Sequence, residues 1–286
     1  MRVLVTGGSG RIGSATVQEL LSHGYGVVNA DQRPPSRDTI PEGSDYRYQQ
    51  TDLGDVGQVA GALSGCDALI HLGAIPSPYR HPDEVVFLNN VGATFAALQA
   101  AMLLGVKKAV IASSLSALGT AWAPEPFPPL YAPVDEAHPL LPHDCYGLSK
   151  EVDERTAEMF HRRTGMQILA YRFPLVASMA EIKHLAEIMR ENPAAQDNWK
   201  VLWAYIDVRD AALACRLGIE ADGLGFDVFN ISAADTVGSA PTEDLIKQYA
   251  PSVEIRHPLP GTATAFSFEK ARRLIGYEPQ YTWRNQ

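Results

Sequence analysis

Short apolar segments alternate with longer segments of helical periodicity through the first 172 residues of the chain. Segments such as VLVT at 3–6 and AVIA at 109–112 show little alternation between apolar and polar positions. Such strands are covered on both faces, as in a parallel sheet. The pattern predicts strands at 2–6, 26–31, 68–72, 109–113 and 168–172, another just before residue 52, and helices at 11–22, 56–63, 83–104 and 144–163. Repeated strand–helix units predict an α/β fold with a doubly wound parallel sheet.

Beyond residue 173 this rhythm weakens. Helices are predicted at 179–191, 207–219, 242–249 and 268–274, with a short strand at 227–231. We expect a sheet domain over 1–172 and a smaller, interleaved region over 173–286 that caps the sheet and shapes a pocket. A proline-rich loop at 120–142 follows the strand at 109–113, and proline cannot join interior helix or strand pairing. This loop either lies at the mouth of an active site or serves only as a spacer.

Composition argues against several classes of protein. The chain is 46% hydrophobic and 20% charged, which is ordinary for a globular protein with a real core. Its formal net charge of −9 argues against a nucleic-acid partner and against docking on an anionic membrane. No secretory signal and no run of about 18 apolar residues is found, so no membrane span is expected. The 3 cysteines are far apart, without the spacing of a metal site, and their small number favours a reducing cytoplasm.

A glycine-rich turn directly follows the first predicted strand. Gly7, Gly10 and Gly13 lie three residues apart in the segment TGGSGRIG at 6–13. Glycines permit a tight turn and let backbone N–H groups approach a pyrophosphate, and the N-terminus of the next helix adds partial positive charge. The turn therefore predicts a dinucleotide site, which includes Arg11 and Ile12.

An acidic residue at the end of the second strand indicates which dinucleotide binds. Asp31 lies 18 residues after Gly13. Its carboxylate can accept hydrogen bonds from the adenosine ribose hydroxyls and would repel a 2′-phosphate, so NAD is favoured over NADP. Arg11 and Arg33 are close enough that either could face a phosphate.

Asp52 and Leu53 follow the third strand. They are expected to meet the adenine, with the carboxylate on the exocyclic amine and Leu53 on the ring face. Alternatively, Asp52 is the N-cap of the next helix.

Tyr146 and Lys150 lie four residues apart at the start of a predicted helix, and such positions share one helix face. A tyrosine phenol has a pKa of about 10, and a nearby ammonium stabilises the phenolate. We expect Tyr146 to act as general acid and base, while Lys150 tunes it and grips the nicotinamide ribose.

A serine at the end of a predicted strand supplies the third group. Ser114 lies at the strand edge where ligands bind in such sheets. We expect Ser114 to hydrogen-bond the substrate oxygen, with Ser116 as the alternative. Ser113 and Ser114 could instead satisfy backbone groups at the strand end.

Taken in order, these motifs resemble an extended short-chain dehydrogenase/reductase, and more narrowly the NAD-dependent epimerase/dehydratase group. The resemblance covers nearly the whole chain and rests on TGGSGRIG at 6–13, Asp31, Asp52-Leu53, HLGA at 71–74, NVGAT at 90–94, Ser113-Ser114, YGLSK at 146–150, YIDVRD at 205–210, FNI at 229–231 and FEKARRLIGY at 268–277. It implies a Rossmann fold, NAD as cofactor, and a catalytic triad of Ser114, Tyr146 and Lys150.

The resemblance also implies roles for residues that no single motif explains. Asn90 would help to fix the central strands near the nicotinamide, and the segment after Arg172 would line the nicotinamide and the substrate. Further cofactor contacts are assigned to Leu72, Gly73, Ala74, Ser113 and Pro174. Substrate contacts are assigned to Pro76, Ser114, Ser116 and Leu175.

Two positions depart from the nucleotide-sugar members of this group. Many of those members have Arg-x-x-Asn after the sixth strand, where the Asn holds the substrate diphosphate, and here Leu175 takes its place. They also usually have Tyr-Gly after the double serine, where this chain has Leu118-Gly119. The chain is short for such members as well. Its size and its HLG segment are more similar to uronate dehydrogenases and related small-sugar dehydrogenases.

We therefore expect an oxidoreductase that transfers a hydride between NAD and a hydroxyl or carbonyl carbon of a sugar-like small molecule. Two alternatives stay open: a nucleotide-sugar epimerase or dehydratase that keeps NAD bound without net redox change, and a non-catalytic NAD-binding protein. In this group the helices after Asp83 and Asp144 commonly pair across a homodimer. The mixed face of 85–104 suits that dimer, and it also suits a monomer with these helices packed inward.

The remaining polar and aromatic residues have structural expectations. His71 is predicted to be a core histidine. Asp207 is predicted to cap a helix, with Arg209 and Asp210 as structural partners there. Surface positions are expected for His138, His143 and His161, and packing positions for Trp199 and Trp203.

Overall fold

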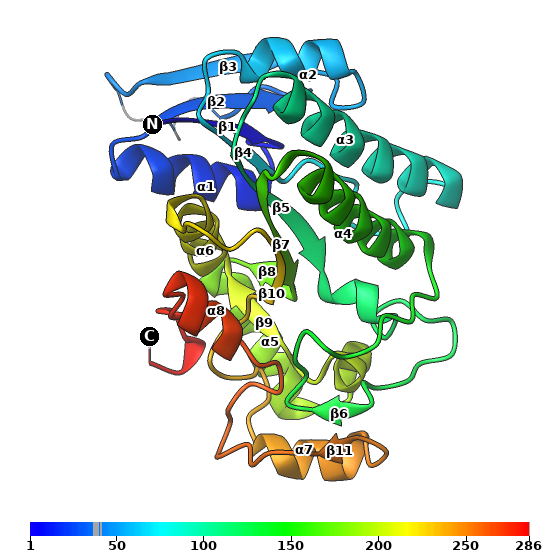
Figure 1. Ribbon diagram of the computed structural model, residues 1–286. Coiled ribbons are helices and arrows are strands. Elements are labelled where there is room, and N and C mark those ends of the chain that lie inside the picture. The colour runs from blue at the N-terminus through cyan, green and yellow to red at the C-terminus, as the bar shows by residue number, and fades with distance from the viewer. Residues whose placement is uncertain (37–39, 41, 286) are drawn as a thin grey trace.

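A sheet of seven parallel strands forms the centre of the protein (Figure 1). The computed structural model describes residues 1–36, 40 and 42–285. The order across the sheet is β10-β7-β5-β4-β1-β2-β3, so the chain moves outward in both directions from β1. The strands are β1 (Arg2–Thr6), β2 (Gly26–Asp31), β3 (Tyr46–Gln50), β4 (Ala68–His71), β5 (Lys108–Ser114), β7 (Gln167–Phe173) and β10 (Phe226–Asn230). This order places a topological switch point between β1 and β4, where ligands bind in such sheets.

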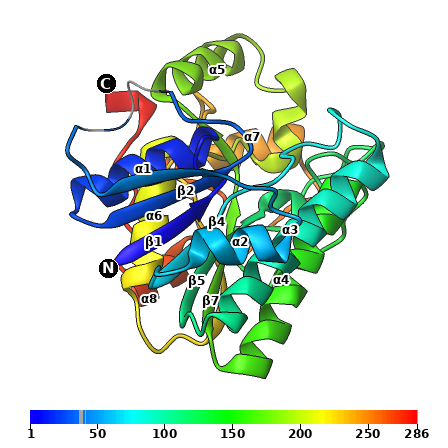
Figure 2. The ribbon, with the colours of Figure 1, turned by 90° about the horizontal axis from the view of Figure 1, so that it is seen from above.

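Helices cover both faces of the sheet (Figure 2). Successive strand residues point to opposite faces, so Val3 and Val5 join one core and Leu4 the other. The first face carries α1 (Arg11–Ser22), α6 (Val208–Glu220) and α8 (Glu269–Ile275), and the second carries α2 (Val56–Leu63), α3 (Asp83–Leu103) and α4 (Cys145–Thr164). The apolar runs of the sequence are therefore explained by strands buried on both sides, and the predicted doubly wound sheet is confirmed.

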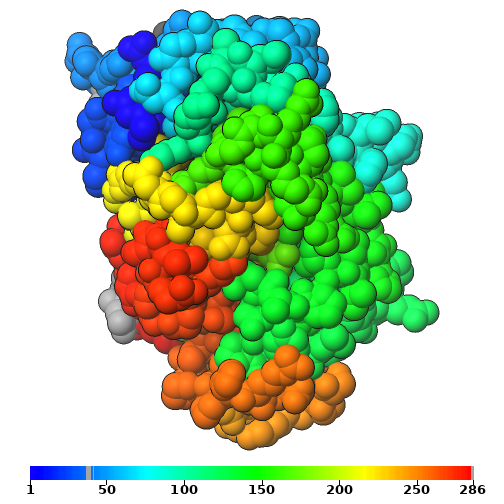
Figure 3. Space-filling view, in the orientation of Figure 1, coloured from blue at the N-terminus to red at the C-terminus, as the bar shows by residue number. Residues whose placement is uncertain are grey.

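A separate core lies beyond the carboxyl end of β5. It begins with Leu115 and Leu118, which directly follow that strand, and its largest buried side chain is Trp203. Figure 3 shows the part of this region around α7 at the end of the molecule opposite the N-terminal strands. Its elements are η2 (Leu115–Leu118), β6 (Tyr131–Ala132), β8 (Leu175–Ala177), α5 (Met179–Glu191), η3 (Ala195–Val201), β9 (Tyr205–Asp207), α7 (Thr242–Tyr249), β11 (Glu254–Ile255) and η4 (Trp283–Asn285).

The second half of the chain also contributes to the main sheet. β10 pairs with β7 at the edge, and α6 packs on the sheet beside α1. The predicted helices and long strands agree with the structure to within about one residue at each end. β6, β8, β9 and β11 were not predicted, because two or three residues are too few to show a period.

The expectation for His138 is corrected, and the structural roles expected for Asp207, Arg209 and Asp210 are confirmed. His138 is 3% exposed, not at the surface: its Nε2 accepts from Leu130 N and its Nδ1 bonds the carbonyl oxygen of Pro139. Asp207 caps α6 as expected, and Arg209 pairs with it at 2.8 Å. Asp210 also has a structural role there: it accepts hydrogen bonds from the backbone N–H groups at 280 and 281.

One helix is long and apolar enough to cross a membrane by its length and composition alone. α3 has sufficient length and a mean hydropathy of 1.4. Half of that helix is buried inside the protein, where Ala97, Leu98 and Ala101 pack in the core of the second sheet face. We therefore interpret α3 as a helix of the folded core.

Candidate active site

A cavity of about 850 Å³ opens at the carboxyl ends of β1, β4, β5 and β7. One wall is the glycine-rich turn and the strand ends, and the other is formed by β8, α5 and η3. The residues predicted from sequence that line it are Gly7, Gly10, Arg11, Ile12, Gly13, Leu72, Ala74, Pro76, Ser113, Ser114, Ser116, Tyr146, Lys150, Pro174 and Leu175. The predicted residues that lie outside its lining are Asp31, Arg33, Asp52, Leu53, Gly73 and Asn90.

The glycines of the turn are required by close backbone approach. A Cβ on Gly13 would lie 2.0 Å from the carbonyl oxygen of Gly7. Gly7 itself has φ +67°, and a Cβ there would lie 2.7 Å from Cα of Gly73. α1 starts at Gly10 with no side-chain cap, and residues 11–13 of its first turn line the cavity. Uncapped amides and a bare backbone at a helix N-terminus suit an anionic group.

Asp31 lies beside this turn at the end of β2. Its carboxylate accepts hydrogen bonds from Ser9 N at 3.1 Å and Arg33 N at 3.0 Å. It is therefore fixed next to the turn while remaining partly exposed. The Arg33 side chain is exposed to solvent.

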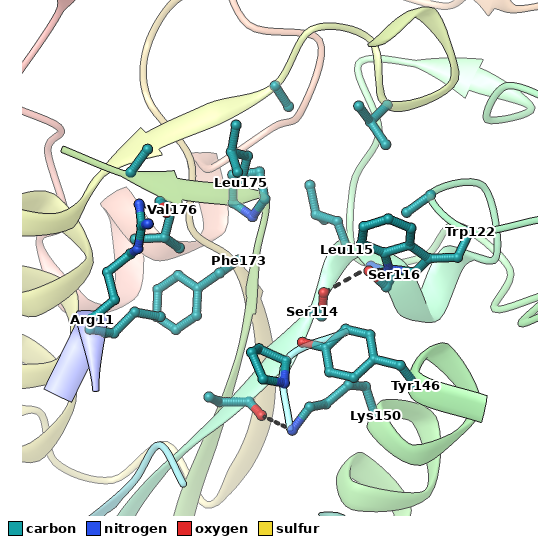
Figure 4. A pocket seen from close by; sticks show the side chains of 18 of the residues that line it. Arg11, Ser114, Leu115, Ser116, Trp122, Tyr146, Lys150, Phe173, Leu175 and Val176 are labelled. Atoms are coloured by element: carbon teal, nitrogen blue, oxygen red, sulfur yellow. Dashed lines mark hydrogen bonds between the residues drawn. The ribbon is translucent and has the colours of Figure 1, made fainter. Parts of the chain in front are cut away.

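Tyr146 and Lys150 project from the first turns of α4 into the cavity (Figure 4). Asp144 caps this helix by accepting from Gly147 N at 2.8 Å, which fixes where the helix begins. The Lys150 ammonium lies 5.9 Å from the ring centroid of Tyr146. It donates to the carbonyl oxygen of Ala112 at 3.0 Å, which ties α4 to β5.

A carboxylate that the sequence analysis did not single out lies beneath Lys150. Asp153 Oδ2 is 3.0 Å from Lys150 Nζ, and the two side chains are 1% and 3% exposed. Burial alone would lower the pKa of Lys150, but the negative charge of Asp153 outweighs it with help from Tyr146, so the pKa is raised. Burial raises the pKa of Asp153, against the effect of Lys150. Lys150 is thus held as a cation.

The two adjacent serines of β5 have different partners. Ser113 donates to Glu154 Oε1 at 2.6 Å, and Glu154 in turn holds Arg172 at 2.8 Å. The Ser113 hydroxyl therefore has a structural partner. Ser114 Oγ accepts from Ser116 N at 3.0 Å and keeps its own proton free to donate. Figure 4 shows the Ser114 and Tyr146 hydroxyls in the same part of the cavity.

Comparisons with known proteins agree with this geometry. The model of the NAD dependent epimerase/dehydratase family matches residues 3–232. The chain belongs to this family. Its cofactor is accordingly NAD, and it is an enzyme of the short-chain dehydrogenase/reductase superfamily.

Individual relatives carry different activities within this family. An NAD-dependent glucose-6-phosphate dehydrogenase of Haloferax volcanii is 26% identical over 97% of this chain and 92% of its own length. A UDP-glucose 4-epimerase of Corynebacterium glutamicum is 24% identical over 99% and 92%. A crystal structure of a UDP-galactose 4-epimerase superposes with a TM-score of 0.70 at 26% identity, covering 99% of this chain and 94% of the other.

The glycine-rich turn at 6–13 fits a dinucleotide. Gly7, Gly10 and Gly13 leave the space that side chains would fill, and the first turn of α1 offers amides without a cap. These residues would hold the pyrophosphate of NAD. Asp31 would accept from the adenosine ribose.

An ion pair joins the two walls of the cavity. Arg11 donates to both carboxylate oxygens of Glu181 on α5, at 2.7 and 2.8 Å, and to the carbonyl oxygen of Val176 at 3.2 Å. Hydrogen bonds from Ser178, together with Arg11, lower the pKa of Glu181 to about 2. The guanidinium of Arg11 is therefore occupied by a carboxylate in this structure.

Two of the predicted residues outside the cavity lining, Asp52 and Leu53, lie between β3 and α2. Asp55, not Asp52, caps α2, so the capping alternative for Asp52 is wrong. The Leu53 side chain reaches the position that a Cβ on Gly73 would take, which keeps the segment after β4 close to the glycine-rich turn.

Two buried polar side chains join the elements around the site. Asn90 bonds both backbone groups of Ile75, at 2.8 and 3.1 Å, and donates to Ser149 Oγ at 3.2 Å. His71 is a core histidine as predicted: it bonds Thr6 Oγ1 at 2.8 Å and Thr94 Oγ1 at 3.2 Å. Burial lowers the pKa of His71 to about 3, so its ring is neutral at pH 7.

Several residues of the site were missed by reasoning from sequence, among them Trp122, Glu181, Asp153 and Lys200. Trp122 donates to Ser116 Oγ at 3.1 Å and lines the cavity from the proline-rich loop, so that loop does lie at the site. Glu181 could have been found, since Ser178 and Glu181 form a capping box that is readable in sequence. Asp153 and Lys200 have no such signal.

Proposed function

We propose that this enzyme is an NAD-dependent dehydrogenase that oxidises a hydroxyl-bearing carbon of a sugar-like small molecule. The observation that carries the proposal is the meeting of Ser114, Tyr146 and Lys150 in one cavity with the glycine-rich turn. A phenol beside a buried ammonium can take the proton of an alcohol, while a hydroxyl donor orients the alcohol oxygen.

Each residue has a distinct task in this reaction. NAD, when bound, supplies the hydride acceptor. Ser114 donates to the substrate oxygen, because its own oxygen is already used by Ser116 N. Tyr146 takes the proton of the substrate hydroxyl at its phenolic oxygen, and the ammonium of Lys150 stabilises the phenolate. Asp153 keeps that ammonium charged and in place.

The substrate side of the cavity favours a small sugar. Leu175 is 51% exposed and lines the cavity, so an alkyl group stands where an amide would hold a diphosphate. The dehydrogenase of Haloferax volcanii, whose name specifies a sugar phosphate, is similar over nearly its whole length.

An epimerase that uses NAD transiently is the second candidate. The similarity to a UDP-glucose 4-epimerase and to a UDP-galactose 4-epimerase, each over 99% of the chain, favours it. The two functions differ in what happens to the cofactor. A dehydrogenase accumulates NADH when supplied with free NAD and substrate, whereas an epimerase retains its NAD and accumulates none. A screen of uronic acids, aldoses and nucleotide sugars by NADH absorbance separates them.

Substitution of Tyr146 tests the mechanism. Tyr146→Phe removes the proton acceptor but keeps the ring, so kcat on the best substrate should fall roughly 10²- to 10⁴-fold, while the affinity for NAD changes little. Tyr25→Phe is the matched control, since its hydroxyl bonds Glu220 away from the cavity. A Tyr146→Phe enzyme with more than about a tenth of the wild-type kcat contradicts the proposal.

We further propose a homodimer formed by α3 and α4. Exposed apolar side chains on these helices include Leu88 at 66%, Phe95 at 44% and Leu148 at 43%. Such residues would be covered by a second copy. Light scattering of the purified protein measures the assembly, and a monomeric mass at micromolar concentration contradicts it. The cytoplasmic location stays a prediction from the sequence.

A further inference from the structure

One charged side chain of the cavity has no task in the proposed oxidation. Lys200 lies in η3 and lines the same cavity as Tyr146. Its side chain is only 15% exposed, so most of it is removed from water. Burying an ammonium is costly unless other partners replace the water.

The other cations, Arg11 and Lys150, each donate hydrogen bonds to a carboxylate, whereas Lys200 does not. Arg11 donates two hydrogen bonds to a carboxylate on α5, and Lys150 donates one to a carboxylate on its own helix. Lys200 Nζ lies 3.6 Å from Asp197 Oδ2, which is beyond hydrogen-bond distance. Within the described ranges of the chain, Lys200 has no closer acidic partner. Its donors are therefore available to a ligand.

The segment that carries Lys200 is held in an unfavourable backbone conformation. Gln196 and Asp197 have φ of 54° and 52°, and Leu202 and Trp203 have φ of 48° and 56°. Side chains other than glycine seldom adopt this left-handed region. Trp203 is fully buried, and its Nε1 donates to the carbonyl oxygen of Pro193 at 2.7 Å, which anchors the segment. Such strain persists where the surroundings impose it, and it is concentrated at ligand sites.

We propose that Lys200 binds an anionic group of the substrate, a phosphate or a carboxylate carried by the sugar. Asp197 holds the ammonium until that group arrives. The Asp197 side chain is 54% exposed and can turn to water at little cost, whereas Lys200 has no such freedom. This inference rests on the proposed function, because it names the substrate class of the same cavity.

The experiment compares charged and neutral sugars on matched variants. NADH formation is measured for a hexose 6-phosphate, a hexuronate, a uridine diphosphate hexose and the neutral hexose. The variants are Lys200→Met, Lys200→Arg and Asp197→Asn. Lys247→Met is the control, since Lys247 is 64% exposed on α7 and pairs with Glu243.

The expected change in kcat/KM for the anionic substrate has opposite signs for substitutions of Lys200 and of Asp197. Lys200→Met should lower kcat/KM for the anionic substrate roughly tenfold to a hundredfold, and leave the neutral hexose within about twofold. Lys200→Arg should retain most of the activity. Asp197→Asn should raise kcat/KM for the anion about twofold, because a competing carboxylate is removed. The probe with the largest Lys200-dependent loss identifies which anion the site takes.

A binding measurement separates this inference from the proposed function. The same sugars are titrated by calorimetry into NAD-saturated Tyr146→Phe protein, with and without Lys200→Met. If the wild type oxidises no sugar but an anionic sugar binds only with Lys200 present, the proposed function fails and the inference stands. If sugars are oxidised and Lys200→Met lowers kcat/KM equally for charged and neutral sugars, or changes kcat/KM for neither kind, the inference is overturned and the function stands. Failure of the NAD-saturated protein to bind any anionic sugar also overturns it.

Discussion

The two walls of the cavity are built by opposite means. The wall at the glycine-rich turn is defined by missing side chains: Gly7 and Gly13 allow backbone to approach backbone more closely than a Cβ permits. The wall formed by α5 and η3 is defined by side chains that a separate core presents, with Lys200 and Glu181 among them. A backbone cradle recognises a pyrophosphate whatever the substrate, whereas side chains on an independent core can change without disturbing the sheet. The first wall is therefore suited to a fixed cofactor and the second to a variable substrate.

The largest effect is expected at the glycine wall. Gly13→Ala places a Cβ 2.0 Å from the carbonyl oxygen of Gly7, and neither backbone segment can move without disturbing the turn. Overpacking of this kind costs about 1–3 kcal/mol. The Kd for NAD should therefore rise roughly tenfold to a hundredfold, whichever substrate the enzyme uses. Calorimetric titration with NAD measures the change.

Gly92→Ala is the matched control for this prediction. Gly92 lies in α3 and a Cβ there meets nothing within 4 Å. That variant should bind NAD normally and be slightly more stable, since alanine suits a helix better than glycine. Normal NAD affinity in Gly13→Ala would show that the wall is not defined by close backbone contact.

The same contrast explains what the sequence could predict. Glycine spacing after a strand is visible because the chain needs glycine at those positions, and the long strands are visible because both faces are apolar. Lys200 and Asp153 gave no signal, because an isolated charge in sequence looks the same on a surface as in a cavity. His138 was misplaced for the same reason: its burial depends on a loop with no period. Asp52 is one candidate for the cap of α2 in the sequence, but the N-cap is Asp55, three residues later.

A second prediction concerns the buried ion pair of Lys150 and Asp153. Asp153→Asn removes the carboxylate 3.0 Å from Lys150 Nζ and leaves its shape. The charges that then face Lys150 are Tyr146, when ionised, and Glu154, while His71 is neutral. Without the opposing charge of Asp153, burial lowers the pKa of Lys150, so less ammonium remains to stabilise the phenolate. The rising limb of kcat against pH in the oxidation direction should therefore move to higher pH by about one unit.

The control for this shift is Glu151→Gln, the carboxylate next to Lys150 in sequence, which is not among the partners of that lysine. It should leave the pH profile in place. A limb that stays fixed in Asp153→Asn, or that moves to lower pH, would mean that Asp153 does not keep Lys150 charged and serves only to hold the helix.

The smallest effect is expected at the contact that spans the two walls. Glu181→Gln weakens the ion pair with Arg11 while keeping the shape of the side chain. The pKa of Glu181 is about 2, below its usual value because hydrogen bonds from Ser178, with Arg11, favour the carboxylate. The ion pair is therefore complete above about pH 4.5, and it is lost as the pH falls towards 2, so a measurement at pH 7 compares an intact pair with a broken one.

Both partners are about half exposed, at 51% and 50%, so water and salt screen the interaction. The dissociation rate of NAD in Glu181→Gln should rise by only about twofold to threefold at low salt, and the difference should shrink at about 1 M salt. Stopped-flow displacement of NAD measures it. Glu187→Gln, on the same helix and 66% exposed, is the control and should release NAD at the wild-type rate. If Glu181→Gln and Glu187→Gln release NAD equally fast, the two walls act independently, and the pair contributes to folding without gating the cofactor.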